Sequence, residues 1–473
     1  MAGAASGNNL GGSWSVKSWL LHEHHSRPLS EWRVTRSRRR AVGSDRSGSV
    51  TAFSESGVRT GHIACFDRNQ GNRIEACVYT GNARFRRFNV QILFSEASAK
   101  VWFAYYGLDP ANNDKPAHAD AAGKIVANVP SAVPTAALAH PAPSGPITFP
   151  MLNAARLYVS IGEPVLFTVD SGGNPIPPRA ADSTDPNYQT RWDFFEVTYI
   201  PLSGTDGLFN FNLSNVQSAN LPLSFSVGGA DPSTKKPVEY SRGWLSGGYN
   251  NFLSYLGTNP DFRQLVLSGT QRVLAPGTAI TAFEQKVIPV PLIDGDYLEA
   301  YIGSVWAKFA AVDLTFVGDP PPNSNTFVTW TGRVQNGQFT FTTNDLPNLV
   351  PIVLNSPSTS DLFENNFRFC ASGCGTSGSL QQNYALQLFG TFCAAFNRSV
   401  MLTTTTLANA PDCEWCRAKE NFYQDPTTNH YSKAVHANAI DGLAYAFQSD
   451  DHCDVSSYVA LINPSDLTIT LND

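Results

Sequence analysis

The sequence predicts a mainly β protein that carries a smaller mixed α/β portion. Only 15% of its 473 residues are charged, while 36 are Gly and 31 are Pro, a balance typical of short strands joined by many turns. Segments that alternate apolar and polar residues recur from about Phe88 onward. This alternation favours a β-sandwich or barrel, and helical periodicity enters only after residue 240.

The strands predicted in the first half follow one another closely along the chain. Four strands of alternating pattern are interrupted by one loop rich in Pro and Ala, and they cover residues 88–94, 100–108, 156–162 and 164–170. Two further strands form a hairpin within Trp192–Leu223, around a polar turn. The run of short strands is the main reason for expecting a sandwich.

The second half mixes helices with strands. One helix is expected at residues 380–402 and another from Tyr431. A hairpin is expected at 326–344, and terminal strands at 444–450 and 467–471. The hairpin has an Asn336-Gly337 turn, the dipeptide that tight β-hairpins prefer. We therefore assign a sandwich to residues 88–235, 311–360 and 440–473, and a mixed α/β portion to 236–310 and 361–439.

Charge separates the N-terminus from the rest of the chain. Residues 1–50 hold eight Lys or Arg against three acidic residues, and they are predicted to be a flexible basic leader. Residues 51–87 are an extension of uncertain structure. The remainder is acidic, which argues against nucleic-acid binding because that binding depends on neutralising phosphates. No run of 18 apolar residues occurs, so no membrane span is expected.

Eight cysteines predict disulfides and a secreted protein, although the N-terminus lacks an apolar signal core. Cys65 and Cys77 are placed to bridge a hairpin. Two close pairs of thiols, at Cys370/Cys374 and Cys413/Cys416, could alternatively bind zinc. We favour disulfides, because the spacing is irregular and because two more cysteines lie nearby in the sequence.

The hairpin within Trp192–Leu223 carries the candidate functional residues. On its first strand a single carboxylate, Glu196, shares a face with Thr198, and on its second strand Asn212 and Ser214 share the polar face. Directional hydrogen-bonding groups beside an acid suit sugar hydroxyls and a glycosidic oxygen. A surface position for Glu196 without function is the alternative. Four aromatic residues are candidate stacking platforms for sugar rings or, equally, core residues: Trp192, Phe194, Trp244 and Tyr249.

The segments RLYVSIGEPVLFTV and DPNYQTRWDFFEVTY resemble the core of glycoside hydrolase family 64, the β-1,3-glucanases, which are related in fold to thaumatin-like proteins. The likeness continues in order through YLEAYIGSVWAKF, FVTWTGRV, FGTFCAAFNRSVML and NHYSKAVHANAIDGLAYAFQSDD to LTITL. It covers about residues 88–473. The resemblance implies a thaumatin-like β-barrel or sandwich beside a mixed α/β portion, with a wide cleft for the glucan.

The resemblance also assigns roles. Members of the family cleave with inversion, and Glu196 occupies the position of the general acid. Four residues match positions that contact sugar: Thr198, Phe209, Asn212 and Ser214. No metal or organic cofactor is implied, because acid–base cleavage uses only side chains and water. The implied partner is a β-1,3-glucan polysaccharide, and a monomer is expected.

One position departs from the family. Its catalytic base is an Asp that follows Val at the end of the second strand, and this chain has Gln217 there. A carboxamide can hold a water molecule but cannot take its proton at neutral pH. Asp206, in the longer turn, is a candidate substitute. Three functions stay open: a glucan hydrolase, a glucan-binding protein with impaired catalysis, and a thaumatin-like interaction or defence protein.

Overall fold

The computed structural model describes residues 100–143, 145–202, 206–408 and 413–472, together with the backbone of five strands between residues 52 and 94. The chain divides into two compact units, Met1–Arg84 and Phe85–Asp473. In the first unit β1 (Ala52–Ser54) pairs with β2 (Gly57–Arg59), and β3 (His62–Phe66) pairs with β4 (Ala76–Thr80). Cys65 lies opposite Cys77 in the β3–β4 register, but the side chains of both, and the leader at 1–50, lie outside the described residues.

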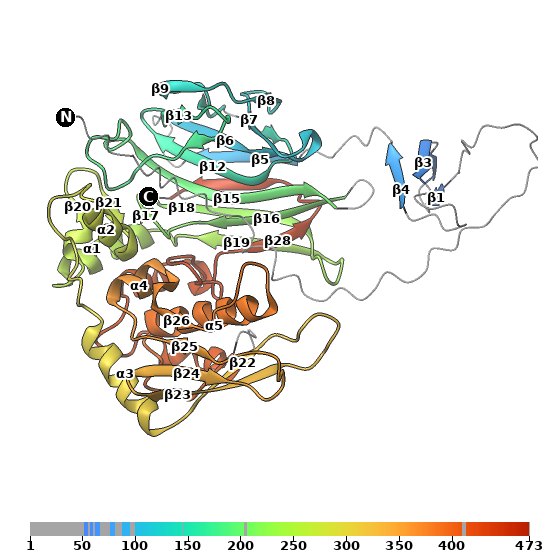
Figure 1. Cartoon of the computed structure of the whole chain (residues 1–473). Coiled ribbons are helices and arrows are strands. Elements are labelled where there is room, and N and C mark those ends of the chain that lie inside the picture. The colour runs from blue at the N-terminus through green and yellow to red at the C-terminus, as the bar shows by residue number, and fades with distance from the viewer. Residues whose placement is uncertain are drawn as a thin grey trace, which may run out of the picture. The chain divides into compact units, whose positions relative to one another are not determined.

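A sheet of thirteen strands dominates the second unit (Figure 1). Its central path runs β11-β5-β29-β18-β28-β16-β15-β12-β6-β7-β8, with β10 added to β6 and β19 to β18. The strands are β5 (Phe88–Phe94), β6 (Val101–Asp109), β7 (Lys115–Ala119), β8 (Ile125–Ala127), β10 (His140–Pro141), β11 (Ile147–Phe149), β12 (Asn153–Ile161), β15 (Arg191–Pro201), β16 (Gly207–Leu213), β18 (Leu223–Ala230), β19 (Pro237–Gly243), β28 (Val459–Ile462) and β29 (Leu467–Leu471).

Alternation along these strands builds the core. Phe195 on β15 stacks on Phe211 of β16 at 4.8 Å, and Phe225 of β18 meets Phe211 edge to face at 4.8 Å. The sheet also curls on itself, since Phe149 of β11 stacks on Tyr105 of β6 at 4.5 Å although these strands are far apart in the sheet order. The inner face of the curled sheet thus encloses one apolar interior, and the predicted sandwich-type fold is confirmed.

A small sheet covers part of the opposite face of the large one. It contains β9 (Ser131–Thr135), β13 (Phe167–Val169) and β14 (Pro175–Ile176). The Phe167 ring contacts Tyr106 and Tyr158 edge to face, at 5.4 and 5.3 Å between centroids. The aromatic residues on this face therefore lie under a second layer instead of facing solvent.

The mixed portion has a sheet of its own, in the order β26-β25-β24-β23-β22-β27. Its strands are β22 (Leu314–Gly318), β23 (Val328–Gln335), β24 (Gln338–Thr342), β25 (Ile352–Leu354), β26 (Cys370–Ser372) and β27 (Thr406–Ala408). The helices α3 (Glu299–Ala311) and α5 (Leu380–Asn397) both pack on Phe339 of β24, through Trp306 at 5.7 Å and Phe392 at 5.9 Å. This sheet lies apart from the thirteen-stranded one in Figure 1, with α5 between them in that view.

The remaining elements join the two sheets in sequence. Three short strands form a separate sheet, and five more helices are described: β17 (Ser218–Ala219), β20 (Val266–Leu267), β21 (Arg272–Leu274), α1 (Gly248–Thr258), α2 (Pro276–Glu284), α4 (Thr359–Glu364), α6 (Glu414–Arg417) and α7 (His430–Ala437). Among the described residues no helix is both long and apolar enough to cross a membrane.

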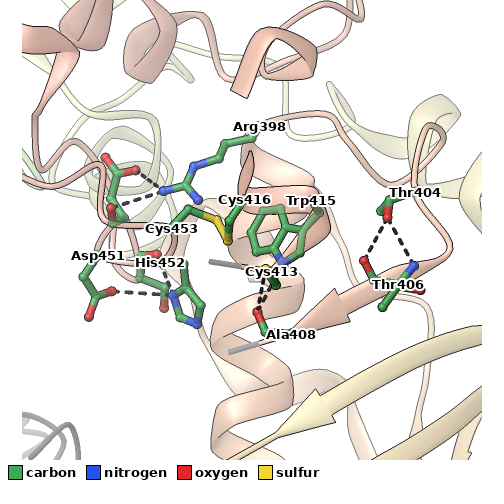
Figure 2. The surroundings of a disulfide bond; sticks show 12 residues. Arg398, Thr404, Thr406, Ala408, Cys413, Trp415, Cys416, Asp451, His452 and Cys453 are labelled. Atoms are coloured by element: carbon green, nitrogen blue, oxygen red, sulfur yellow. Dashed lines mark hydrogen bonds and ion pairs between the residues drawn. A yellow bond between two sulfur atoms is a disulfide. The ribbon is translucent and has the colours of Figure 1, made fainter. Parts of the chain in front are cut away.

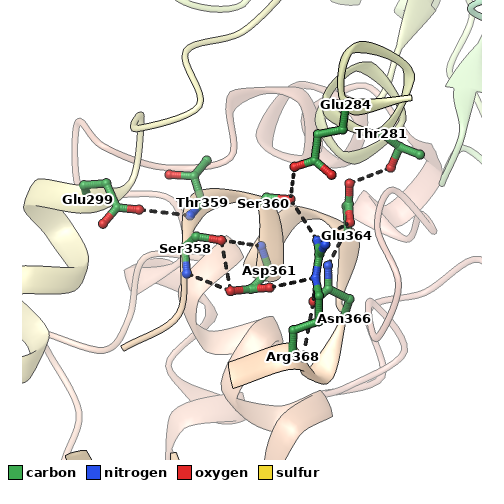
Figure 3. A network of polar contacts seen from close by, with 10 residues as sticks. All are labelled: Thr281, Glu284, Glu299, Ser358, Thr359, Ser360, Asp361, Glu364, Asn366 and Arg368. Atoms are coloured by element: carbon green, nitrogen blue, oxygen red, sulfur yellow. Dashed lines mark hydrogen bonds and ion pairs between the residues drawn. The ribbon is translucent and has the colours of Figure 1, made fainter. Parts of the chain in front are cut away.

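Helix α4 is fixed to its neighbours by polar contacts (Figure 3). Ser358 and Asp361 form a capping box at its N-terminus, which satisfies backbone N–H groups that the helix itself leaves without partners. The Thr359 backbone N–H donates to Glu299 of α3 at 3.1 Å, and the Thr281 hydroxyl of α2 donates to Glu364 at 2.6 Å. These bonds hold α2, α3 and α4 together.

Several sequence predictions are confirmed and two are wrong. The hairpin turn at Asn336-Gly337 has φ values of 51° and 79°, and helices α5 and α7 begin where expected. Residues 444–450, expected to be a strand, form a loop, because the segment folds back on itself: the Asp450 N–H donates to the Phe447 carbonyl and the Ala446 N–H donates to the Asp450 carboxylate. Residues 311–360 do not join the sandwich, since their strands pair within the six-stranded sheet.

Candidate active site

Glu196 lies at the centre of a polar row that crosses three strands. Its register partners are Arg156 on β12 and Asn212 on β16, so all three side chains point to the same face of the sheet. Asn212 Nδ2 donates a hydrogen bond to Glu196 Oε2 at 3.1 Å. Glu196 is half-buried, which leaves its carboxyl group accessible while the amide fixes its orientation.

A second row continues the polar surface. Thr198 lies opposite Asn210, and the Tyr458 hydroxyl, just before β28, donates to Asn210 Oδ1 at 2.9 Å. Thr198 and Asn210 are half-buried and Tyr458 is 36% exposed. Together with Glu196 and Asn212 these residues form what we call the polar patch. It presents hydroxyl, amide and carboxyl groups on adjacent strands of the sheet.

Arg156 supplies a positive charge beside this patch. Its guanidinium lies 4.9 Å from the centre of the Phe194 ring. Burial alone would lower the pKa of Arg156, but the nearby Tyr158, Tyr106 and Glu196 raise it above its usual value. The guanidinium therefore stays charged, and its positive charge attracts the Glu196 carboxylate on the neighbouring strand.

The loop between α7 and β28 borders the polar patch. The Asn215 backbone N–H, just after β16, donates to the Tyr445 carbonyl at 2.8 Å, and the Ser457 hydroxyl donates to the Leu213 carbonyl at 2.9 Å. Both ends of residues 445–457 are thus bound to the end of β16 that carries Asn212. We call residues 445–457 the cap loop.

The interior of the cap loop is rigidly held (Figure 2). Arg398 and Asp450, both fully buried, form an ion pair at 2.9 Å, and His436 Nε2 lies 3.0 Å from the other carboxylate oxygen of Asp450. A disulfide joins Cys453 in the loop to Cys416 in α6. The ion pair and the disulfide therefore fix the backbone of the cap loop, and with it the positions of the exposed residues of the loop.

Five of the predicted sugar contacts are buried aromatic rings. No more than 3% of each is exposed: Trp192, Phe194, Phe209, Trp244 and Tyr249. Phe209 stacks on Phe211 at 5.4 Å on the core face of the hairpin, and Trp244 packs against Tyr249 and Phe252. The expectation that these rings contact glucose is corrected, because other side chains already cover their faces.

Three further predicted residues lie at the two ends of the hairpin. Asp206 immediately precedes Gly207, which pairs with Pro201 at the turn end of the hairpin. Gly207 lies five strand positions, about 17 Å, from Asn212, the register partner of Glu196. The Asn463 side-chain amide donates to Asp206 Oδ1 at 2.8 Å. Asp206 is too far to serve as a substitute base. Ser214 is buried beyond the end of β16. Gln217 also lies beyond that end, where its carbonyl accepts from the Ala275 N–H at 3.0 Å.

A buried carboxylate positions the segment that follows Gln217. Asp193 Oδ2 accepts hydrogen bonds from the backbone N–H groups of Asn220 and Leu221, at 2.8 and 2.6 Å. Burial raises the pKa of Asp193 to about 7, although these N–H donors and the nearby Arg272 and Arg191 act in the opposite direction. Strand alternation does not reveal this role, because Asp193 shares the core face with Phe195 and Val197, where an apolar residue is expected.

The raised pKa of Asp193 predicts a pH-dependent stability. The folded protein keeps this proton up to about pH 7, whereas the unfolded chain loses it near 3.8, so the free energy of unfolding falls as pH rises between these values. Relative to Asp193→Asn, the wild type should lose about 4 kcal/mol across this window. Urea unfolding of both proteins at pH 4, 5.5, 7 and 8 measures the difference. A difference that does not vary with pH would contradict the assignment.

Four of the described cysteines form two disulfides, while Cys393 is a buried thiol. Cys370 bonds to Cys374, and Cys416 bonds to Cys453. The alternative zinc site, which needed Cys416 as a thiolate, is therefore wrong. Within the described part of the chain no group of three or more His, Cys, Asp or Glu side chains is arranged to hold a metal ion.

Known sequences match this chain over most of the second unit. The family model for glycoside hydrolase family 64, described as β-1,3-glucanase, matches residues 87–471. A glucan endo-1,3-β-glucosidase from Cellulosimicrobium cellulans and one from an Arthrobacter species are each 26% identical over 329 residues. The match covers 69% of this chain and 53% of each relative, so the chain spans about half the length of these curated relatives.

Solved structures share the fold. A laminaripentaose-producing β-1,3-glucanase in complex with laminaritetraose has 24% sequence identity and a TM-score of 0.64, and the match covers 82% of this chain and 98% of that one. A β-1,3-glucanase domain from Clostridium beijerinckii has 21% identity and a TM-score of 0.60 with the same coverage. Since the family model spans far more than half of the sequence and the fold agrees, this chain belongs to glycoside hydrolase family 64.

Proposed function

We propose that this protein hydrolyses β-1,3-glucan, with Glu196 as the general acid. The observation that carries the proposal is the half-buried Glu196 carboxyl group, which Asn212 orients within a surface of hydroxyls and amides. Its proton would pass to the glycosidic oxygen as the bond to the anomeric carbon breaks. Membership of the family and its relatives named glucan endo-1,3-β-glucosidase support β-1,3-glucan as the substrate.

The polar patch suits substrate binding beside this acid. Thr198 and Asn210 are register partners, and the Tyr458 hydroxyl donates to Asn210, so hydroxyl and amide groups lie together that can exchange their partners for sugar hydroxyls. Arg156 holds a fixed positive charge at the opposite end. We propose that successive glucose units lie along these two rows and bring one glycosidic oxygen to Glu196.

We further propose that the protein acts as a monomer outside the cell. The two disulfides support an oxidising compartment, since such bonds persist in extracellular proteins and are rare in the cytosol. Gel filtration of the purified full chain tests the oligomeric state, and a dimer would contradict that part of the proposal.

Laminarin, a soluble β-1,3-glucan, tests the activity. We expect the full chain to release short oligosaccharides from it, and to leave a β-1,4-glucan of similar length uncut. Proton NMR during the first minutes should show the α-anomer at the new reducing ends, because one displacement by water inverts the β linkage.

The other outcomes separate the remaining functions. Binding of laminarin in a pull-down or gel-retardation assay with no sugar released would indicate a glucan-binding protein without catalysis. No binding and no release would overturn the proposed function altogether.

A further inference from the structure

The proposed general acid, Glu196, needs a general base, and the position where the family has its base is occupied by Gln217. Inversion requires a carboxylate to accept the proton of the attacking water, and Gln217 cannot accept it. Asp206 lies too far along the hairpin, and Asp193 faces the core side and holds the Asn220–Leu221 backbone. A different carboxylate is therefore needed near the polar patch.

The cap loop carries two accessible carboxylates, Asp451 and Asp454, and the first is the candidate. Asp451 follows the buried Asp450 in the loop whose two ends are bound to β16 beside Asn212. Its side chain is 41% exposed, and its Oδ1 lies 3.6 Å from His452 Nδ1. In Figure 2 the Asp451 carboxylate points away from the disulfide and the buried Arg398. Asp451 is thus accessible while its backbone is fixed.

Two tyrosines connect Asp451 with the polar patch. Burial raises the pKa of the Tyr445 hydroxyl well above its usual value, and the negative charges of Asp451, Glu196 and Asp450 raise it further. Burial and Asp451 likewise raise the pKa of Tyr458 to about 12, and the Tyr458 hydroxyl donates to Asn210 in the patch. The charges of Asp451 and Glu196 thus both act on the Tyr445 hydroxyl, and the Tyr445 backbone carbonyl accepts a hydrogen bond from Asn215 at the end of β16.

The frame behind Asp451 suits a catalytic group. Catalytic side chains must be held to within a fraction of an ångström, and rigid supporting contacts provide this. The Asp450–Arg398 ion pair and the Ala446 N–H, which donates to Asp450 at 2.8 Å, fix one side of the loop. The Cys416–Cys453 disulfide fixes the other.

We propose that Asp451 is the general base of this chain, in place of the residue that Gln217 replaces. The proposal rests on the hydrolase function proposed above. A water molecule attacks the anomeric carbon from the face opposite the leaving group, and its proton passes to the Asp451 carboxylate. The proton of Glu196 goes to the departing oxygen, so one C–O bond forms as another breaks. Both carboxyl groups then return to their starting states by proton exchange with solvent.

Asp451→Asn tests the proposal, with Asp454→Asn as the matched control. Asp454 is an exposed carboxylate three positions further along the same loop, so the control removes the same charge. We expect Asp451→Asn to lower kcat on laminarin by about 10²–10⁴-fold with KM little changed, and the control to behave as wild type. Near-ultraviolet circular dichroism and the thermal midpoint confirm that both variants are folded.

The pH profile separates a base from a positioning residue. A base must be ionised, so kcat/KM of the wild type should fall at low pH, and this fall should disappear in Asp451→Asn. The titratable groups around Asp451 are His452, Tyr445 and Tyr458, and Glu196 and Asp450 also act on Tyr445. All five groups are present in both proteins, so they do not account for the difference. Persistence of the low-pH fall would overturn the proposal.

Two results distinguish failure of this proposal from failure of the proposed function. Full activity of Asp451→Asn, together with loss of activity in Glu196→Gln, would overturn the role of Asp451 and leave the hydrolase intact. Absence of laminarin hydrolysis by the wild type would overturn both. Recovery of turnover in Asp451→Asn by the added change Gln217→Asp would support the proposal, because it would restore a carboxylate at the position that the family uses.

Discussion

Glu196→Gln should lower kcat on laminarin by about 10²–10⁴-fold while leaving laminarin binding nearly unchanged. The carboxamide has almost the same shape as the carboxyl group and can still accept the hydrogen bond from Asn212 Nδ2. It cannot release a proton to the leaving oxygen, so only the chemical step is affected. Initial rates of reducing-sugar release, together with laminarin affinity measured by calorimetry, separate kcat from binding.

Glu163→Gln is the control for this prediction. Glu163 is exposed in the turn after β12, on a different part of the surface, so its change removes one carboxylate without touching the polar patch. Its kcat should equal that of the wild type. Equal activity of Glu196→Gln and Glu163→Gln would mean that Glu196 is not the acid, whatever the activity of the wild type.

Asp450→Asn should lower the free energy of unfolding by about 3–5 kcal/mol, the usual cost of leaving one partner of a buried ion pair uncompensated. Arg398 is fully buried between Trp415, Phe422 and Phe447, with its guanidinium 5.1 to 5.8 Å from their ring centres, so water cannot replace the lost carboxylate. The new amide N–H₂ would also face a group that donates, such as the Ala446 N–H. Urea unfolding followed by near-ultraviolet circular dichroism measures the loss.

Asp466→Asn provides the control, because Asp466 is exposed in the turn before β29 and its change should alter stability little. The double variant Arg398→Met/Asp450→Asn tests the mechanism, since removal of the cation should recover part of the loss. A double variant as unstable as the sum of its single changes would show that the two side chains act independently. That result would contradict a stabilising ion pair at the base of the cap loop.

The sequence was most informative where a local pattern decides the structure. Alternation along residues 192–213 correctly separated Glu196, Thr198 and Asn212 from the apolar face, because successive strand residues point to opposite sides. The predictions of the Asn336-Gly337 turn and of helix α5 were also correct, because residues close together in the sequence determine both. Resemblance then added the family and the expected roles.

The same alternation failed for the aromatic residues. Phe194 lies on the same side of β15 as Glu196, but Tyr158 stacks on it at 5.2 Å, and Phe167 of the small sheet covers Tyr158 in turn. Strand periodicity distinguishes two faces but does not say which parts of a face another layer covers. That depends on β13 and β9, whose position is set by contacts between distant segments.

The sequence by itself therefore determined the family, the mainly β fold and the hairpin that carries Glu196, since these rest on local alternation and on motifs in order. Only the tertiary structure decided which polar groups surround that carboxyl group. Arg156, Asn210 and Tyr458 come from three other strands or their ends, and Asp451 comes from the cap loop. Their meeting depends on strand pairing, a buried ion pair and a disulfide across long stretches of chain, interactions that no local pattern encodes.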